Sequence, residues 1–142
     1  MRGSMAHMVL REIYGAWRNH DLDRLASYLP DDFAHDIVLP PDVTPFAGLC
    51  QTKRTVLQRL QNILSDFEVV RFDTSKLLIQ GDRAAVQVPL TYWHRTTGTT
   101  LESTLGCFWE LEEGWPVRLI EYHDVDRLSR FRQKLQTSGS MA

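Results

Sequence analysis

The sequence lacks most of the local signatures that identify an enzyme class directly. Only two cysteines occur among 142 residues, and Cys50 and Cys107 form no Cys-x-x-Cys motif. A zinc ribbon or a redox pair is therefore not indicated, and we expect two reduced, buried thiols. Glycine-rich phosphate loops, Gly-x-Ser-x-Gly elbows and cysteine–histidine nucleophile patterns are missing as well. Chemistry of those kinds is not predicted.

Neither an excess of one charge nor a long apolar run is present. The 16 basic and 18 acidic residues give a net charge of -2, which does not favour nucleic acid or an anionic membrane as a partner. No apolar run approaches the roughly 20 residues that span a bilayer, and no hydrophobic segment with a cleavage signal opens the chain. We expect a cytoplasmic protein.

The length and the 43% of hydrophobic residues are typical of one globular domain. We place this domain at residues 7–136. The flanking residues 1–6 and 137–142 resemble expression-vector remnants or frayed ends.

The first half of the chain has helical periodicity. Apolar residues recur at helical spacing over 9–17, over 22–29 and again between Val56 and Leu64. Asp21 and Thr52 are placed to cap the second and third of these helices, and Arg59 is expected to face water. Between them, residues 33–39 alternate as a short strand and a proline-rich loop follows at 40–45.

The second half has the period of strands. Residues 67–80, 84–96, 100–112 and 116–124 read as four long strands, separated by the hairpin signals Gly81-Asp82, Thr97-Gly98 and Glu113-Gly114. An amphipathic helix closes the chain. Helices followed by an antiparallel meander predict the α+β class.

The last strand sets titratable side chains on both of its faces. Alternation places Tyr122 and Asp124 on one face and Glu121 and His123 on the other. Only one face can line a pocket, and the sequence does not decide which one is concave. We expect Asp124 to face the cavity and Glu121 and His123 to form a surface or interface pair, although Asp124 could equally cap the final helix.

The order of these elements resembles the nuclear transport factor two-like superfamily, and most of all its ketosteroid isomerase-like and SnoaL-like polyketide cyclase branch. The resemblance is carried by five short motifs: Asp21-Leu22-Asp23, Leu29-Pro30-Asp31-Asp32-Phe33, Pro45-Phe46-Ala47-Gly48, Phe108-Trp109-Glu110-Leu111 with Gly114, and Glu121-Tyr122-His123-Asp124-Val125. It implies a cone in which a curved antiparallel sheet and the N-terminal helices enclose one apolar pocket, a cystatin-like roll.

The resemblance also implies site residues. An aspartate that ends the last strand is the proton-abstracting base of SnoaL-like cyclases, and Asp124 matches it. Tyr14 is placed like a helix-one tyrosine that donates a hydrogen bond to the substrate oxygen. The base of ketosteroid isomerase falls near Ile37, which does not support a steroid isomerase.

Further pocket residues follow from the strand faces. His35 shares a face with Phe33 and Ile37 and could polarise a carbonyl or orient Asp124, or be a buried histidine with a structural role. Tyr14 could likewise be a core residue. The residues expected to bind substrate are Trp17, Ile37, Tyr92, His94, Trp109 and Tyr122. No metal site is predicted, because no two histidines have helical ligand spacing.

These expectations define a homodimeric enzyme that acts on an apolar carbonyl compound without a cofactor. Asp124 would remove a proton, Tyr14 or His35 would stabilise the enolate, and the outcome would be isomerisation or intramolecular aldol cyclisation. Two other readings remain open. One is a non-catalytic small-molecule-binding protein, and the other is a dimeric structural module that uses an exposed sheet face with Trp93 and Arg95.

Overall fold

A computed structural model describes the backbone of residues 2–141 and the side chains of residues 5–137. It confirms the α+β class. The elements follow one another in this order: α1 (Arg2–Arg18), α2 (Leu22–Ala26), β1 (Ala34–Val38), β2 (Gly48–Cys50), α3 (Lys53–Asp66), β3 (Phe67–Phe72), β4 (Leu78–Gln80), β5 (Arg83–His94), β6 (Thr100–Glu112), β7 (Trp115–His123) and α4 (Val125–Met141).

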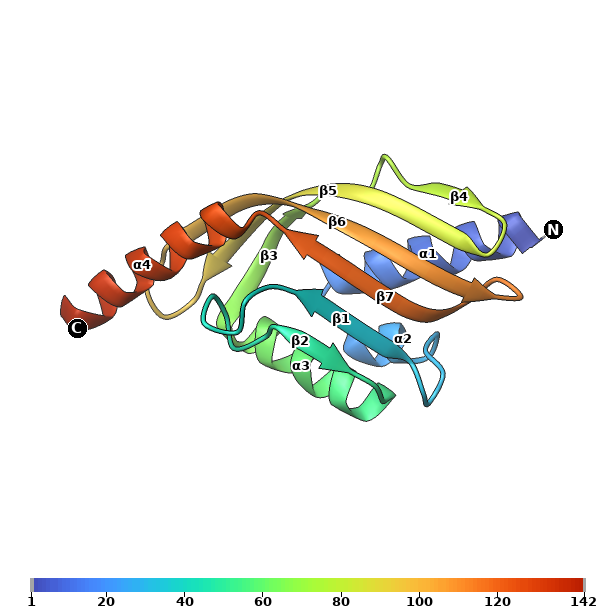
Figure 1. Ribbon diagram of the computed structural model, residues 1–142, viewed down its shortest axis with the longest axis horizontal. Coiled ribbons are helices and arrows are strands. Elements are labelled where there is room, and N and C mark those ends of the chain that lie inside the picture. The colour runs from blue at the N-terminus through green and yellow to red at the C-terminus, as the bar shows by residue number, and fades with distance from the viewer. Residues whose placement is uncertain (1, 142) are drawn as a thin grey trace.

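The strands form one curved, unclosed sheet in the order β2-β1-β7-β6-β5-β3, with β4 paired to β5. The sheet is mixed because β1 runs parallel to β7 while the other pairs are antiparallel. Figure 1 shows the long strands β5, β6 and β7 curving over the helices α1, α2 and α3, while α4 continues outward from the end of β7. The cone-like shape expected from the resemblance is confirmed.

The helix starts follow the local chemistry of the sequence. Asp21 accepts a hydrogen bond from the backbone N–H of Arg24, and Thr52 accepts one from Thr55, so both expected caps are confirmed. The terminal helices extend further than expected, since α1 begins at Arg2 and α4 continues to Met141. Residues 1 and 142 lie outside the described residues. No described helix is long and apolar enough to cross a membrane.

The run from 67 to 80 is two strands, where the sequence predicts one. The chain leaves the sheet after Phe72, and the Asp73 side chain accepts a hydrogen bond from the backbone N–H of Ser75. This local turn competes with strand pairing. The short strand β2 was not predicted either. All three predicted hairpins form, and Gly81, Gly98 and Gly114 adopt positive φ angles in them.

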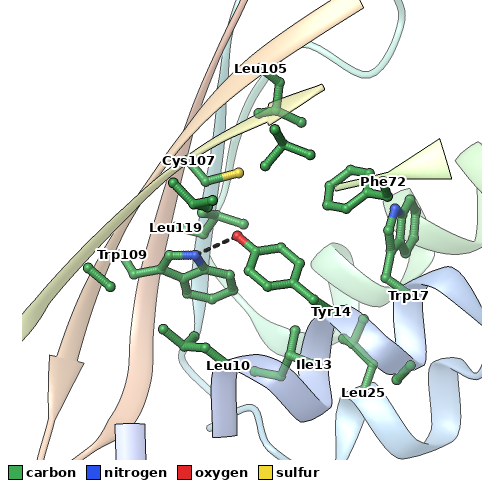
Figure 2. Close-up of a cluster of buried hydrophobic side chains, with 14 of the residues drawn as sticks. Leu10, Ile13, Tyr14, Trp17, Leu25, Phe72, Leu105, Cys107, Trp109 and Leu119 are labelled. Atoms are coloured by element: carbon green, nitrogen blue, oxygen red, sulfur yellow. Dashed lines mark hydrogen bonds between the residues drawn. The ribbon is translucent and has the colours of Figure 1, made fainter. Parts of the chain in front are cut away.

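The core lies between the concave face of the sheet and the helices. Every second side chain of β6 from Leu101 to Leu111 is buried, and so are Ala84 to Leu90 at the same spacing on β5. The inner face of α1 packs against them, as Figure 2 shows for Leu10, Ile13 and Tyr14. Cys107 is buried in this cluster, whereas Cys50 is only half-buried, and both are free thiols.

The cap of α3 offers a test of the fold. We expect Thr52→Ala to lower the free energy of unfolding by about 1 kcal/mol, because the N–H of Thr55 loses its side-chain acceptor. Thr52→Asn keeps an acceptor and serves as the matched control. Urea denaturation measures both, and equal losses in the two variants would contradict the assigned cap.

Candidate functional site

One cavity occupies the inside of the cone. Its volume is about 350 Å³, which lies within the range of small-molecule pockets. Its walls come from α1, α2, the concave face of the sheet, α3, the loop before β2 and α4, and most of them are apolar or aromatic. Seven predicted site residues line it: Tyr14, Trp17, His35, Ile37, Tyr92, His94 and Trp109.

Two predicted site residues, Asp124 and Tyr122, do not line the cavity, and the expectation for both is corrected. The Tyr122 side chain is 51% exposed and stands edge to face against Phe108, with ring centroids 5.6 Å apart. Asp124 is at the surface, where its Oδ1 accepts a hydrogen bond from the backbone N–H of Arg127 at 3.1 Å. Its Oδ2 lies 3.5 Å from Nε of the same arginine. Asp124 is the cap of α4.

A β-bulge explains why the opposite face of β7 is the inner one. Leu111 pairs with Pro116, but Glu110 pairs with Arg118, so Val117 is an extra residue on β7. One extra residue turns the later side chains of a strand to the other face of the sheet. Buried Cys107 consequently stands opposite Glu121, and Glu121 points into the cavity.

The bulge brings two titratable residues of β7 beside the histidine of β1. Glu121 Oε2 lies 3.2 Å from Nε2 of His35, and Glu121 Oε1 lies 3.4 Å from Nε2 of His123. The side chain of Glu121 is 16% exposed, that of His35 is 2% exposed and that of His123 is 15% exposed. A carboxylate therefore sits between two imidazoles in a largely apolar cavity. Glu121 and His123 were expected on the outer surface, and that expectation is wrong.

The surroundings keep Glu121 ionised. Burial by itself raises the pKa of this carboxyl, but the attraction of His35 and then the hydrogen bond with His123 outweigh burial and hold the pKa well below its ordinary value. A stable negative charge in the cavity wall can orient an imidazole and stabilise it when it gains a proton.

Arg59 of α3 reaches the cluster from behind. Its guanidinium donates to the backbone carbonyls of His35 at 3.1 Å and of Gly48 at 2.9 Å, and its Nη1 lies 3.4 Å from Nδ1 of His35. The side chain is 9% exposed, so the expectation that it faces water is wrong. The helical spacing of α3 places Arg59 at a polar position, but the long side chain of Arg59 folds back toward β1 and β2.

Two tryptophan–tyrosine pairs form another part of the wall. Nε1 of Trp109 donates to the hydroxyl of Tyr14 at 2.8 Å, and Nε1 of Trp17 donates to the hydroxyl of Tyr92 at 3.0 Å. Figure 2 shows the first pair, with the sulfur of Cys107 on the same side as the Tyr14 hydroxyl. Burial first, and then the Cys107 thiol, raise the pKa of Tyr14. Burial also raises the pKa of Tyr92, so both phenols stay protonated donors.

The cluster contains residue types that bind metal ions elsewhere, since two histidines and a carboxylate suit several divalent ions. Across the described residues, however, no group of three such side chains is arranged to hold a metal ion. What the arrangement offers chemically is proton transfer next to an apolar surface.

Solved structures described as NTF2-like proteins share this cone-like α+β fold. Residues 10–128 match the model of the SnoaL-like domain, so this chain belongs to the SnoaL-like family. Among curated proteins none matches significantly.

Solved structures with this fold carry names from several enzyme classes. A candidate isomerase from Rhodopseudomonas palustris is 22% identical, with a TM-score of 0.77 over 87% of this chain and 92% of that one. A candidate polyketide cyclase from Xanthomonas campestris pv. campestris is 16% identical, with a TM-score of 0.74 over 91% and 100%. An LEH-like epoxide hydrolase from M. tuberculosis is 12% identical, with a TM-score of 0.76 over 99% and 98%. At these identities the likeness concerns the fold alone.

The position of Asp124 yields a direct prediction. Because its carboxylate caps α4, we expect Asp124→Ala to lower the free energy of unfolding by about 1 kcal/mol and Asp124→Asn to change it by less than about 0.5 kcal/mol. Urea denaturation compares the two variants. A large loss of unfolding free energy in Asp124→Asn would contradict the cap, because it would show that the negative charge of Asp124 stabilises the fold.

Glu121 yields a second prediction, on pH dependence. Since its folded pKa is depressed, its contribution to stability is present above the unfolded pKa of about 4.3 and is lost as the pH falls below that value. Between pH 4.5 and 3, the free energy of unfolding should therefore fall more steeply in the wild type than in Glu121→Gln, by up to about 1.4 kcal/mol per pH unit. Parallel curves from urea titrations would contradict the assigned ionisation.

Proposed function

We propose that this protein is an enzyme that performs acid/base chemistry on an apolar carbonyl compound without a cofactor, leading to isomerisation or intramolecular aldol cyclisation. The observation that supports this most is the cluster of His35, Glu121 and His123 in the wall of an apolar cavity of about 350 Å³. The SnoaL-like family and the isomerase and cyclase names among the structural neighbours support the same class.

The reaction begins with the removal of a proton from the carbon next to the carbonyl. The C–H bonding pair moves into the carbonyl system, the oxygen gains the negative charge of an enolate, and the proton goes to an imidazole nitrogen of the cluster. Glu121 stabilises the imidazolium that results. Returning the proton to another carbon gives an isomer. Alternatively, the enolate carbon attacks a second carbonyl of the same molecule and closes a ring, and the oxygen of that carbonyl, which gains the C=O bonding pair, takes the proton back from the imidazolium.

Tyr92 is the donor best placed to stabilise the enolate oxygen. Its hydroxyl oxygen already accepts a hydrogen bond from Trp17, and no acceptor for its own hydrogen occurs among the described residues. The Tyr14 hydroxyl, in contrast, lies in the core between Trp109 and the Cys107 thiol. A preorganised donor of this kind stabilises developing negative charge.

The shape of the walls favours a flat substrate. Phe72 stacks on Tyr92 with ring centroids 6.3 Å apart, and Phe67 lies 5.9 Å from Tyr92 and 5.9 Å from Phe131. Aromatic walls bind aromatic rings by offset or edge contacts. The proposed substrate is therefore a ketone on, or beside, an aromatic ring system.

Hydrogen exchange tests the proposal without knowledge of the natural product. The probe is 2-tetralone in D2O, an aromatic ketone with acidic α-protons, and NMR follows the replacement of these protons by deuterium. We expect the protein to accelerate exchange over buffer, and Glu121→Gln and His123→Gln to lower the enzymatic rate roughly 10²-fold to 10⁴-fold, the usual contribution of acid/base groups.

Asp124→Asn is the control in this assay, because its side chain lies outside the cavity. It should exchange at the wild-type rate. Binding of the ketone with no acceleration of exchange would contradict the enzyme and leave a small-molecule-binding protein. Loss of exchange in Asp124→Asn alone would contradict the cluster as the proton-transfer site.

A further inference from the structure

The two histidines of the cluster are not equivalent, because Arg59 contacts only one of them. Nη1 of Arg59 lies 3.4 Å from Nδ1 of His35, and both side chains are buried. A guanidinium has only donors and stays protonated in proteins, so Nδ1 of His35 has to be the acceptor in this contact. The ring hydrogen of His35 then resides on Nε2, the nitrogen that faces Glu121 at 3.2 Å.

This arrangement leaves His35 without a nitrogen for the substrate. Its Nε2 is fully buried, lies 3.2 Å from the carboxylate of Glu121 and makes no hydrogen bond, and its Nδ1 faces Arg59. His123 differs from His35. Its Nε2 contacts Glu121 at 3.4 Å, while its Nδ1 has no hydrogen-bond partner among the described residues and is not fully buried. Of the two rings, only that of His123 keeps a nitrogen that a ligand in the cavity can reach.

We propose that Arg59 is a positioning residue that holds His35 as its Nε2–H tautomer, so that His35 and Glu121 together orient His123, whose Nδ1 exchanges the proton with the substrate. The inference deepens the proposed function and rests on it for the last step. It assigns each member of the chain Arg59–His35–Glu121–His123 one task. Arg59 sets the tautomer, His35 directs its Nε2–H at the nearby carboxylate of Glu121 as an electrostatic contact, Glu121 accepts from His123, and His123 takes up the proton.

The charges around the cluster fit this assignment. The carboxylate of Glu121 and the guanidinium of Arg59 contact different nitrogens of the His35 ring. A proton that arrives on His123 therefore meets the negative charge of Glu121 directly, whereas a proton on Nδ1 of His35 would face the positive charge of Arg59. Electrostatics and hydrogen bonding thus favour the same histidine.

The experiment reads the tautomer of each histidine in the full-length, ligand-free protein by long-range ¹H–¹⁵N NMR, with His35→Gln and His123→Gln as assignment controls. We expect the wild type to show His35 with hydrogen on Nε2 and bare Nδ1. Hydrogen on Nδ1 of His35 in the wild type would overturn the proposal, and this readout does not depend on any variant being stable.

Arg59→Met then tests the cause. We expect the Nε2–H preference of His35 to be lost and the exchange of 2-tetralone protons to slow by about 10-fold to 100-fold, less than the loss on removing a base. Arg54→Met, the same change at an exposed position of α3, should alter neither. An unchanged His35 tautomer in folded Arg59→Met would overturn the role of Arg59.

The two proposals can fail separately. If His35 shows the expected tautomer but no exchange occurs in the wild type, the proposed enzyme is contradicted and Arg59 remains a tautomer-setting residue of a binding pocket. If exchange is rapid but persists in His123→Gln and disappears in His35→Gln, the enzyme stands and the assignment of His123 is wrong.

Discussion

The site depends on the burial of one carboxylate. Removing the Glu121 charge from water costs several kcal/mol, and such a charge persists only when it is paired and hydrogen-bonded. His35 and His123 supply that pairing from β1 and from β7 itself. Because β1 and β7 are neighbouring parallel strands, the sheet that forms the cone also holds the cluster together. Fold and candidate chemistry therefore share one constraint.

Local chemistry predicts much of the fold, because caps and turns depend on a few neighbouring residues. Asp21, Thr52 and the hairpin glycines all occupy the positions expected of them. Arg59 was misjudged for the complementary reason. Its position in the helical repeat predicts a polar, exposed residue. In the folded protein β1 and β2 lie beside α3, and their backbone carbonyls accept hydrogen bonds from its guanidinium. Tertiary partners of that kind are not visible in the spacing of one helix.

The inner face of β7 could not be read from alternation either. The pattern separates Glu121 and His123 from Tyr122 and Asp124, but two sets remain, and hydrophobicity favours placing the tyrosine inside. The bulge at Val117 decides the matter, since an unbulged hairpin would set Tyr122 opposite Leu105 on the buried face of β6. The sequence does contain a partial signal for the inner face of β7. One face of β6 is clearly apolar, and the residues of β7 that pair with that face point into the core.

The corrected face changes what family membership implies for this chain. The aspartate expected from the resemblance is present as Asp124, but the backbone turns into α4 there and uses its carboxylate as a cap. The residues that point inward are His123, one position earlier, and Glu121, three positions earlier. If proton transfer occurs in this cavity, an imidazole backed by a buried carboxylate performs it, and that pair is a different base from a single aspartate in an apolar pocket. The substrate must then present its acidic proton toward the β1–β7 wall, with its oxygen toward the aromatic wall that carries Tyr92.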